Sequence, residues 1–178
     1  ALQMSGLFVA GQKLGSVLER LGGGLEIRTD VDLPMGSGLG TSSILAAAVL
    51  RALSEMCGRA PDDQALCDDI MRLEQLMTTG GGWQDQAGGV FPGVKLVTSG
   101  PGLRQRLRVQ PLSWSRERET EFENLVVLYY TGIQRIAKHL LKQVVGSYLA
   151  RETAAVQVLH SIKTLAMEMS YAIEHGEW

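Results

Sequence analysis

The sequence predicts a mixed α/β protein, an α+β arrangement with helices and strands in two layers. Three observations lead to this prediction. Apolar side chains recur every three to four residues in several segments and every second residue in others, which are the periods of helices and strands. The 178 residues are enough to bury a sizeable core. No internal repeat, low-complexity tract or linker divides the chain, so we expect one structural unit.

The amino-terminal half should contain a helix, a strand and two further helices. Leucines spaced three and four residues apart in residues 7–21 predict an amphipathic helix that ends at a run of three glycines. Apolar and charged residues then alternate in residues 25–32, as in a strand with one covered face. Helical spacing returns in residues 44–56 and 66–77, and Asp62 supplies a helix-start signal for the second of these two stacked helices.

The carboxyl-terminal half should begin with strands and end with helices. Residues 89–98, 103–112 and 123–130 are rich enough in β-forming side chains to predict three strands. Residues 136–148 predict a helix, and apolar residues stepping by four and three in residues 155–173 predict a longer one. We expect that apolar seam to pack on a helical neighbour.

Composition and charge exclude several classes of protein. With 17 basic and 19 acidic residues and a net charge of −2, the chain is neither an acidic disordered tail nor a strongly basic nucleic-acid binder. No apolar run approaches the roughly 18 residues of a membrane-spanning helix, and the first residues do not form a signal peptide. We therefore expect a cytoplasmic protein without nucleic-acid or membrane partners. Cys57 and Cys67 are too few for a disulfide framework and are expected to be reduced core thiols.

The most informative segment is PMGSGLGTSS at residues 34–43, between the predicted strand and the next helix. Alternate glycines at 36, 38 and 40 allow successive amides to turn inward as a row of donors, and a helix starting near Thr41 adds its positive dipole end. Such a cradle suits the several oxygens of a triphosphate. A Walker loop is excluded because no Lys-Ser/Thr pair follows Gly40. The remaining alternative is a flexible turn with a Ser or Thr helix cap, which needs far fewer glycines and hydroxyls.

A pair of carboxylates forms a second candidate site. Glu74 lies at the border of the apolar stripe of its helix, about 70° from the centre of the stripe at 100° per residue. The glycine-rich turn that follows can bring Asp85 near it. A magnesium ion on phosphates needs a carboxylate and usually a hydroxyl, and deprotonation of an alcohol needs another carboxylate, so Glu74, Ser42 and Asp85 fit these roles. The alternative for Glu74 is a solvated position on the helix surface.

Residues 34–43 resemble the phosphate loop of the GHMP sugar and isoprenoid kinases, whose pattern is P-x-G-x-G-L-G-S-S. Thr41 departs from it by replacing the first serine. The eleven-residue step from Glu74 to Asp85 is also similar to the step between the magnesium ligand and the catalytic base of that family. The resemblance implies ATP and magnesium as cofactors, Asp85 as the base, and Ser42 and Glu74 as magnesium ligands. It also implies an ATP-binding set made of Pro34, Gly36, Ser37, Gly38, Leu39, Gly40, Thr41, Ser42 and Ser43.

Three blocks between residues 33 and 138 resemble the branch of this family that phosphorylates L-fucose, including the kinase half of bifunctional enzymes that go on to make GDP-fucose. They are LPMGSGLGTSSILAA, LEQLMTTGGGWQDQAGGVFPGVKL and LYYTGIQRIAK. The resemblance implies transfer of the ATP γ-phosphoryl to the anomeric hydroxyl of L-fucose, and it allows for a fused nucleotidyltransferase module. GGWQDQ is shared with the heptose 7-phosphate kinases, which are the alternative, and a non-catalytic sugar or nucleotide sensor is a second one.

The sugar site is expected beside the glycine-rich turn. Trp83 can stack on the apolar face of a sugar, although a core position is an equal alternative. Arg135, near the start of a predicted helix, can face a phosphate or a sugar hydroxyl. The expected substrate-binding set is Gly81, Gly82, Trp83, Gln84 and Arg135.

The family resemblance also implies a domain organisation. Residues 1–132 would form the ATP-binding part, similar to domain 2 of ribosomal protein S5 and incomplete at its start. Residues 133–178 would form the helical beginning of a truncated ferredoxin-like part. We expect an internal piece of a longer kinase, inactive alone, because the second glycine-rich loop of the family has no counterpart among the isolated glycines after Gly102.

Overall fold

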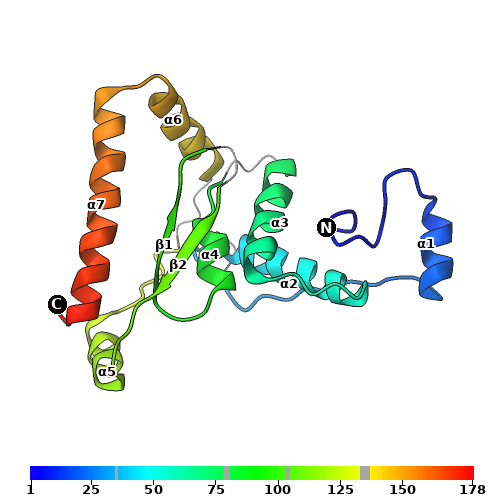
Figure 1. Ribbon diagram of the computed structural model, residues 1–178, viewed down its shortest axis with the longest axis horizontal. Coiled ribbons are helices and arrows are strands. Elements are labelled where there is room, and N and C mark those ends of the chain that lie inside the picture. Colours follow the sequence, from blue (N-terminus) through cyan, green and yellow to red (C-terminus); the bar gives the residue numbers. More distant parts are fainter. Residues whose placement is uncertain (35, 78–80, 103–104, 133–136) are drawn as a thin grey trace. The chain divides into compact units, whose positions relative to one another are not determined.

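Figure 1 presents a computed structural model of the chain, which describes residues 1–34, 36–77, 81–102, 105–132 and 137–178. The side chains of residues 137–140 are not part of that description. The chain falls into two compact units, Ala1–Phe91 and Pro92–Trp178, and each is described by itself. Within the described ranges, no helix is long and apolar enough to cross a membrane.

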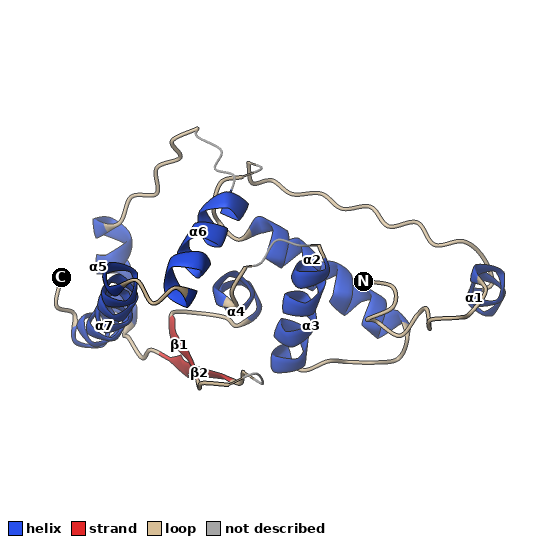
Figure 2. Ribbon diagram, turned by 90° about the horizontal axis from the view of Figure 1, so that it is seen from above, coloured by secondary structure: helices blue, strands red, loops and turns tan. Residues whose placement is uncertain are grey.

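The first unit is helical. It contains α1 (Leu14–Leu21), α2 (Thr41–Met56), α3 (Asp63–Leu76) and α4 (Gln84–Val90). Helices α3 and α4 lie against α2 and against each other, as Figures 1 and 2 agree. The stacked pair expected from the helical periodicity is therefore confirmed as α2 and α3.

The predicted first helix is only partly present, as Leu14–Leu21, and the predicted first strand is absent. Helix α1 ends as expected, because Gly22 adopts a left-handed φ of 73° and its N–H donates to the Glu19 carbonyl at 3.1 Å. The strand predicted for residues 25–32 is wrong: these residues have no regular structure, and Ile27 and Val31 are exposed. An alternating pattern makes a strand only where a second strand is available to accept its hydrogen bonds, and the described residues of this unit supply none.

Two apolar clusters form the core of the first unit, and α2 contributes to both. Leu53 packs with Leu7 and Val17, whereas Leu50, one turn earlier, packs with side chains of α3. Residues three apart on a helix lie close to the same face, so one stripe of α2 serves both neighbours. Helix α2 is thus the central element, and its first residue directly follows the glycine-rich loop.

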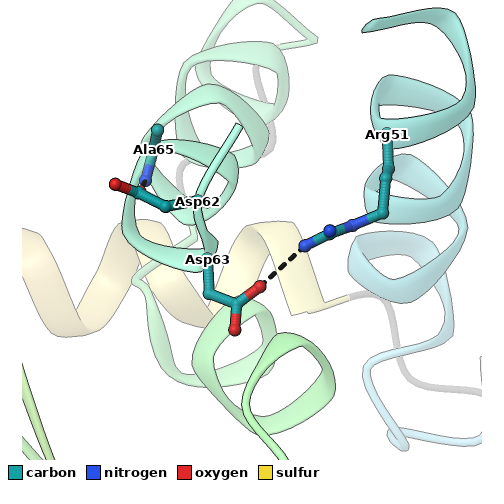
Figure 3. A network of polar contacts seen from close by, with 4 residues as sticks. All are labelled: Arg51, Asp62, Asp63 and Ala65. Carbon is teal, nitrogen blue, oxygen red and sulfur yellow. Dashed lines mark hydrogen bonds and ion pairs between the residues drawn. The ribbon is translucent and has the colours of Figure 1, made fainter. Parts of the chain in front are cut away.

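The start of α3 is fixed by polar contacts that Figure 3 shows from close by. The Asp62 carboxylate caps the helix by accepting the Ala65 N–H at 2.7 Å, which confirms the predicted start signal. Arg51 of α2 donates to the Asp63 carboxylate at 2.7 Å. Because both side chains of this ion pair are partly exposed, it adds about 0–1 kcal/mol to stability.

The second unit contains a two-stranded sheet and three helices. Strand β1 (Lys95–Ser99) pairs antiparallel with β2 (Leu107–Pro111), and Val97 lies opposite Val109. The helices are α5 (Arg116–Leu125), α6 (Ala137–Leu149) and α7 (Thr153–His175), which confirms the two helices predicted at the end of the chain.

The strand predictions in the second unit need correction. The strand predicted from residue 89 begins at Lys95, because residues 84–90 are helical, and the strand predicted for 103–112 is shorter. The strand predicted for 123–130 is wrong: α5 runs to Leu125, and residues 126–130 are exposed without regular structure. Ser115 caps α5 by accepting the Arg118 N–H, and acidic side chains follow in its first turn, which together favour a helix.

Side chains of α5 contact the carboxyl-terminal end of α7 and the residues that follow it. Phe122 lies between Trp114 and Trp178, with ring centroids 5.3 and 5.5 Å away. Arg118 also donates to the Glu174 carbonyl. The apolar seam predicted for α7 is largely exposed in its middle, at Ile162 and at Met169. The domain boundary expected near residue 132 stays a prediction.

Candidate active site

The glycine-rich loop has the backbone that its sequence predicts. Gly36, Gly38 and Gly40 have φ values of 73°, 78° and 69°, a left-handed region that favours glycine. Gly40 occupies the N-cap position of α2, where no side chain caps the helix. The alternative interpretation, a turn with a Ser or Thr helix cap, is therefore wrong for this loop. The first amides of α2 face the loop without a capping side chain, as a site for an anion requires.

The hydroxyl groups of the loop differ in their surroundings. The hydroxyl oxygens of Ser37 and Thr41 are buried and have no hydrogen-bond partner among the described residues. Ser43 is 2% exposed, and its hydroxyl donates to Oε1 of Glu74. Ser42 is exposed on the first turn of α2. Two buried hydroxyls thus remain able to bind a ligand in the loop.

Glu74 is held by side chains from two other helices. Its Oε1 accepts the Ser43 hydroxyl of α2, and its Oε2 accepts Nε2 of Gln86 of α4 at 2.7 Å. Gly81 lies beside the same oxygen, because a Cβ at that position would be 3.4 Å from Oε2. The hydroxyl that meets Glu74 is therefore that of Ser43, whereas the ligand role predicted for the exposed Ser42 stays a prediction.

Asp85 lies against the loop. It is the second residue of α4 and exposed, and a Cβ on Gly40 would be 3.2 Å from its Cβ and 3.3 Å from its Cγ. Gly40 therefore serves two purposes, since its left-handed φ turns the loop and its missing side chain admits Asp85. The structure brings the carboxyl group of Asp85 to the edge of the predicted phosphate cradle.

Helix α4 is fixed along its length by close contacts. At its far end Gly89 meets α2 so closely that a Cβ there would be 2.6 Å from Cγ1 of Ile44. Asp85 also contacts Gly40 of the loop, and Gln86 donates to Glu74, so α4 makes three contacts within two turns. The short helix therefore sets the position of Asp85 relative to both the loop and α3.

The other predicted site residues surround the start of α4. Trp83 is its half-buried N-cap residue, Gln84 and Gly82 are exposed, and Gly81 is half-buried. Arg135 lies outside the described residues. Pro34 and Leu39 are exposed in the loop.

Gln86 was not predicted from the sequence. The only signal would have been a helix at residues 84–90, because Gln86 then falls next to the apolar face made by Ala87 and Val90.

The donor set fits a magnesium ion that also uses phosphate oxygens. No group of three or more His, Cys, Asp or Glu residues that could hold a metal occurs in the described part of the chain. Magnesium usually takes one or two carboxylates together with water and substrate phosphates. Glu74 supplies a carboxylate that accepts from Ser43 and Gln86, and the buried hydroxyl of Thr41, the first residue of α2, directly follows the loop.

Comparison with known proteins gives consistent matches. Residues 9–93 match the GHMP kinases N terminal domain. The chain is 42% identical over 161 residues to L-fucokinase/L-fucose-1-P guanylyltransferase of Bacteroides fragilis, covering 90% of this chain and 17% of that protein. It is 43% identical over 154 residues to bifunctional fucokinase/GDP-fucose pyrophosphorylase of Arabidopsis thaliana, covering 86% and 15%.

A more distant relative acts on another sugar. The chain is 29% identical over 153 residues to D-glycero-alpha-D-manno-heptose 7-phosphate kinase of Campylobacter jejuni, covering 85% of this chain and 44% of that protein. No solved structure matches. The chain spans only 17% and 15% of the length of the two fucokinase relatives.

Proposed function

We propose that the protein is an ATP-dependent kinase that phosphorylates L-fucose at its anomeric hydroxyl, starting from the match of residues 9–93 to the GHMP kinases N terminal domain. The observation that carries the proposal is that two carboxylates lie beside the glycine-rich loop and the first turn of the helix that follows it. Asp85 lies against Gly40 of the loop, and Glu74 accepts the Ser43 hydroxyl from the helix that the loop starts. Relatives with 42 and 43% identity support L-fucose as the acceptor.

The proposed reaction follows from these positions. The loop amides and the buried hydroxyls of Ser37 and Thr41 bind the triphosphate of ATP. Asp85 accepts the proton of the sugar hydroxyl while the sugar oxygen forms a bond to the γ-phosphorus. The bond from that phosphorus to its bridging oxygen breaks, and ADP and fucose 1-phosphate leave. Bound magnesium supplies charge neutralisation on the phosphates, and Glu74 with a loop hydroxyl, from Ser42 or Thr41, would hold it.

The lack of basic residues in the segment that leads into α4 supports a neutral sugar. The half-buried Trp83 offers an indole face that suits the ring carbons and methyl group of fucose. No basic residue occurs between Arg72 and Lys95, whereas a sugar phosphate needs cations. The heptose 7-phosphate kinase at 29% identity makes that activity the second candidate. The presence of Asp85 argues against a non-catalytic sensor.

The wider setting is also part of the proposal. Two relatives carry names that join fucokinase to a guanylyltransferase or pyrophosphorylase, so we propose that a nucleotidyltransferase module shares the polypeptide. Such a pair would pass fucose 1-phosphate directly into nucleotide-sugar synthesis for salvage. A cytoplasmic location fits this use of ATP and free sugar.

The proposal is tested with the intact gene product, magnesium, ATP and L-fucose. Phosphorus NMR of the mixture should reveal a sugar 1-phosphate together with ADP. A matched incubation with L-fucose methylated at the anomeric oxygen should give no product, since the reacting hydroxyl is blocked. Absence of the 1-phosphate, or equal product from the blocked sugar, would refute the assignment.

A further inference from the structure

Gln86 is a buried polar residue whose contact lies in the site but has no role in the reaction described above. It is 1% exposed, and its Nε2 donates to Oε2 of Glu74 at 2.7 Å. We propose that Gln86 is a positioning residue, which fixes the Glu74 carboxylate so that it can receive a metal ion carried by the nucleotide. This inference rests on the proposed kinase function.

The orientation of the Gln86 amide is set by Glu74. Its Oε1 is buried and has no hydrogen-bond partner among the described residues, so the described hydrogen bonding of the side chain lies on the Nε2 side. A flipped amide would bring Oε1 against the carboxylate oxygen, where both groups are acceptors. An apolar side chain of similar size would avoid the cost of the unpaired oxygen. The charge-assisted hydrogen bond to Glu74 is therefore what this buried amide contributes.

The two donors that hold Glu74 come from two different helices. The Ser43 hydroxyl of α2 binds Oε1, and the Gln86 amide of α4 binds Oε2. A glutamate on a helix surface has three rotatable side-chain bonds, whose freedom must be lost when the carboxylate binds a metal. Fixing each oxygen beforehand reduces that loss.

The test measures metal binding in the intact gene product and needs no sugar. Mn²⁺ binding in the presence of ADP is followed by electron paramagnetic resonance for wild type, Gln86→Met and Gln86→Asn. Methionine keeps the length of the side chain without a donor, and asparagine is too short by one methylene. We expect the Kd for Mn²⁺ to rise at least about tenfold in both variants, the scale reported for lost outer-shell partners of metal sites. Gln75→Met is the matched control, because Gln75 is an exposed glutamine beside Glu74 on α3.

A second comparison separates positioning from general structural damage. In a Glu74→Gln background, Gln86→Met should change the Kd for Mn²⁺ by less than about twofold, because the carboxylate that it positions is gone. Melting curves of each variant check that the fold is kept, and Gln86→Asn, which adds no volume, remains informative if the methionine variant does not fold. An unchanged Kd in both Gln86 variants would overturn the inference, as would an equal effect with and without Glu74. Failure of L-fucose phosphorylation alone would instead refute the proposed substrate.

Discussion

At the residue scale, the two carboxylates of the site have different surroundings that suit different work. Asp85 is exposed at the edge of the loop, where an approaching hydroxyl can reach it. Glu74 is half-buried, and its two oxygens are engaged by a hydroxyl and an amide. A general base must meet the substrate proton directly, whereas a metal ligand works best when its position is fixed in advance. This contrast supports Asp85 as the base and Glu74 as the ligand.

Replacing Asp85 by asparagine tests its role in proton transfer. The change keeps the size of the side chain beside Gly40 and removes only its ability to take up a proton. In the intact enzyme we expect kcat to fall by at least about 10²-fold, the usual loss for an acid–base group, with ATP affinity nearly unchanged. Steady-state kinetics and nucleotide titration measure the two effects. A variant with wild-type kcat would exclude Asp85 from the chemistry.

The Cys67 thiol gives the first unit a pH dependence above neutrality. Burial, with a smaller contribution from the nearby Asp68 and Asp63 carboxylates, raises the pKa of this thiol from its ordinary 9.0 to about 11. Between these values the unfolded chain loses the proton first, so stability present below pH 9 is lost as pH rises toward 11. The melting-temperature advantage of wild type over Cys67→Ala should therefore narrow across this range. Leu66→Ala, a neighbouring change without a titrating group, should keep a constant difference.

The loop, both carboxylates and their spacing could be predicted from the sequence, but their hydrogen-bond partners could not. Neighbouring helical residues point about 100° apart. Whether Ser42 or Ser43 faces Glu74 therefore depends on how α2 is rotated against α3, which packing decides. Gln86 was missed for the same reason, since its burial follows from the docking of α4.

At the element scale, the shortest helix has the largest effect on the site. Helix α4 has seven residues, fewer than two turns, so it shows almost no apolar periodicity and follows a glycine-rich turn. Sequence patterns detect a helix by repetition, which α4 lacks. The longer α2 and α3 repeat their apolar positions several times and were predicted correctly.

The missing strands have a related cause. Residues 25–32 and 123–130 have a local composition that suits a strand, yet a strand also needs a partner that accepts its hydrogen bonds. Strands β1 and β2 pair with each other in an antiparallel register of five residues, so each supplies the hydrogen-bond partners of the other. Local alternation does not indicate whether such a partner exists, so pairing could not be predicted from these segments alone.

The capping of α3 gives a prediction about stability that is separate from catalysis. Removing the Asp62 carboxylate in Asp62→Ala leaves the Ala65 N–H without its acceptor, and the free energy of unfolding should fall by about 1 kcal/mol. Asp62→Asn keeps a side-chain oxygen and should lose only a few tenths of that amount. Denaturant unfolding of both variants measures the difference, and kcat should be unchanged because Asp62 lies outside the site. Equal losses in the two variants would contradict the capping role.

At the scale of the whole molecule, every described site residue lies in the unit Ala1–Phe91, which contains most of the matched domain at residues 9–93. The two periods of apolar side chains were sufficient to predict an α/β protein, because each period is visible within a short segment. A division between residues 91 and 92 was not predicted, since no composition shift or linker marks it. Contacts between helices and strands decide where a compact unit ends, and these contacts cannot be read from the sequence.

The lack of basic residues around the described site residues in the sequence leads to the last prediction, which separates L-fucose from heptose 7-phosphate. The heptose substrate adds about two negative charges remote from the reacting hydroxyl, and a site for it needs converging arginines or lysines. Residues 73–94, which include the described site residues Glu74, Trp83 and Asp85, contain no basic side chain. The half-buried indole of Trp83 instead favours an uncharged, methyl-bearing sugar.

A competition assay with both sugars in the intact enzyme decides between them. We expect kcat/KM for L-fucose to exceed that for heptose 7-phosphate, and Trp83→Ala to raise KM for the sugar much more than KM for ATP. Trp114→Ala is the matched control, because that tryptophan packs on Phe122 in the second unit and should leave the ratio of the two KM values unchanged. A higher kcat/KM for the heptose phosphate would make the fucose assignment wrong while the kinase assignment survives. The phosphate group is the main chemical difference between the two sugars. A preference for the heptose phosphate would therefore mean that basic side chains from outside residues 73–94 reach the sugar site.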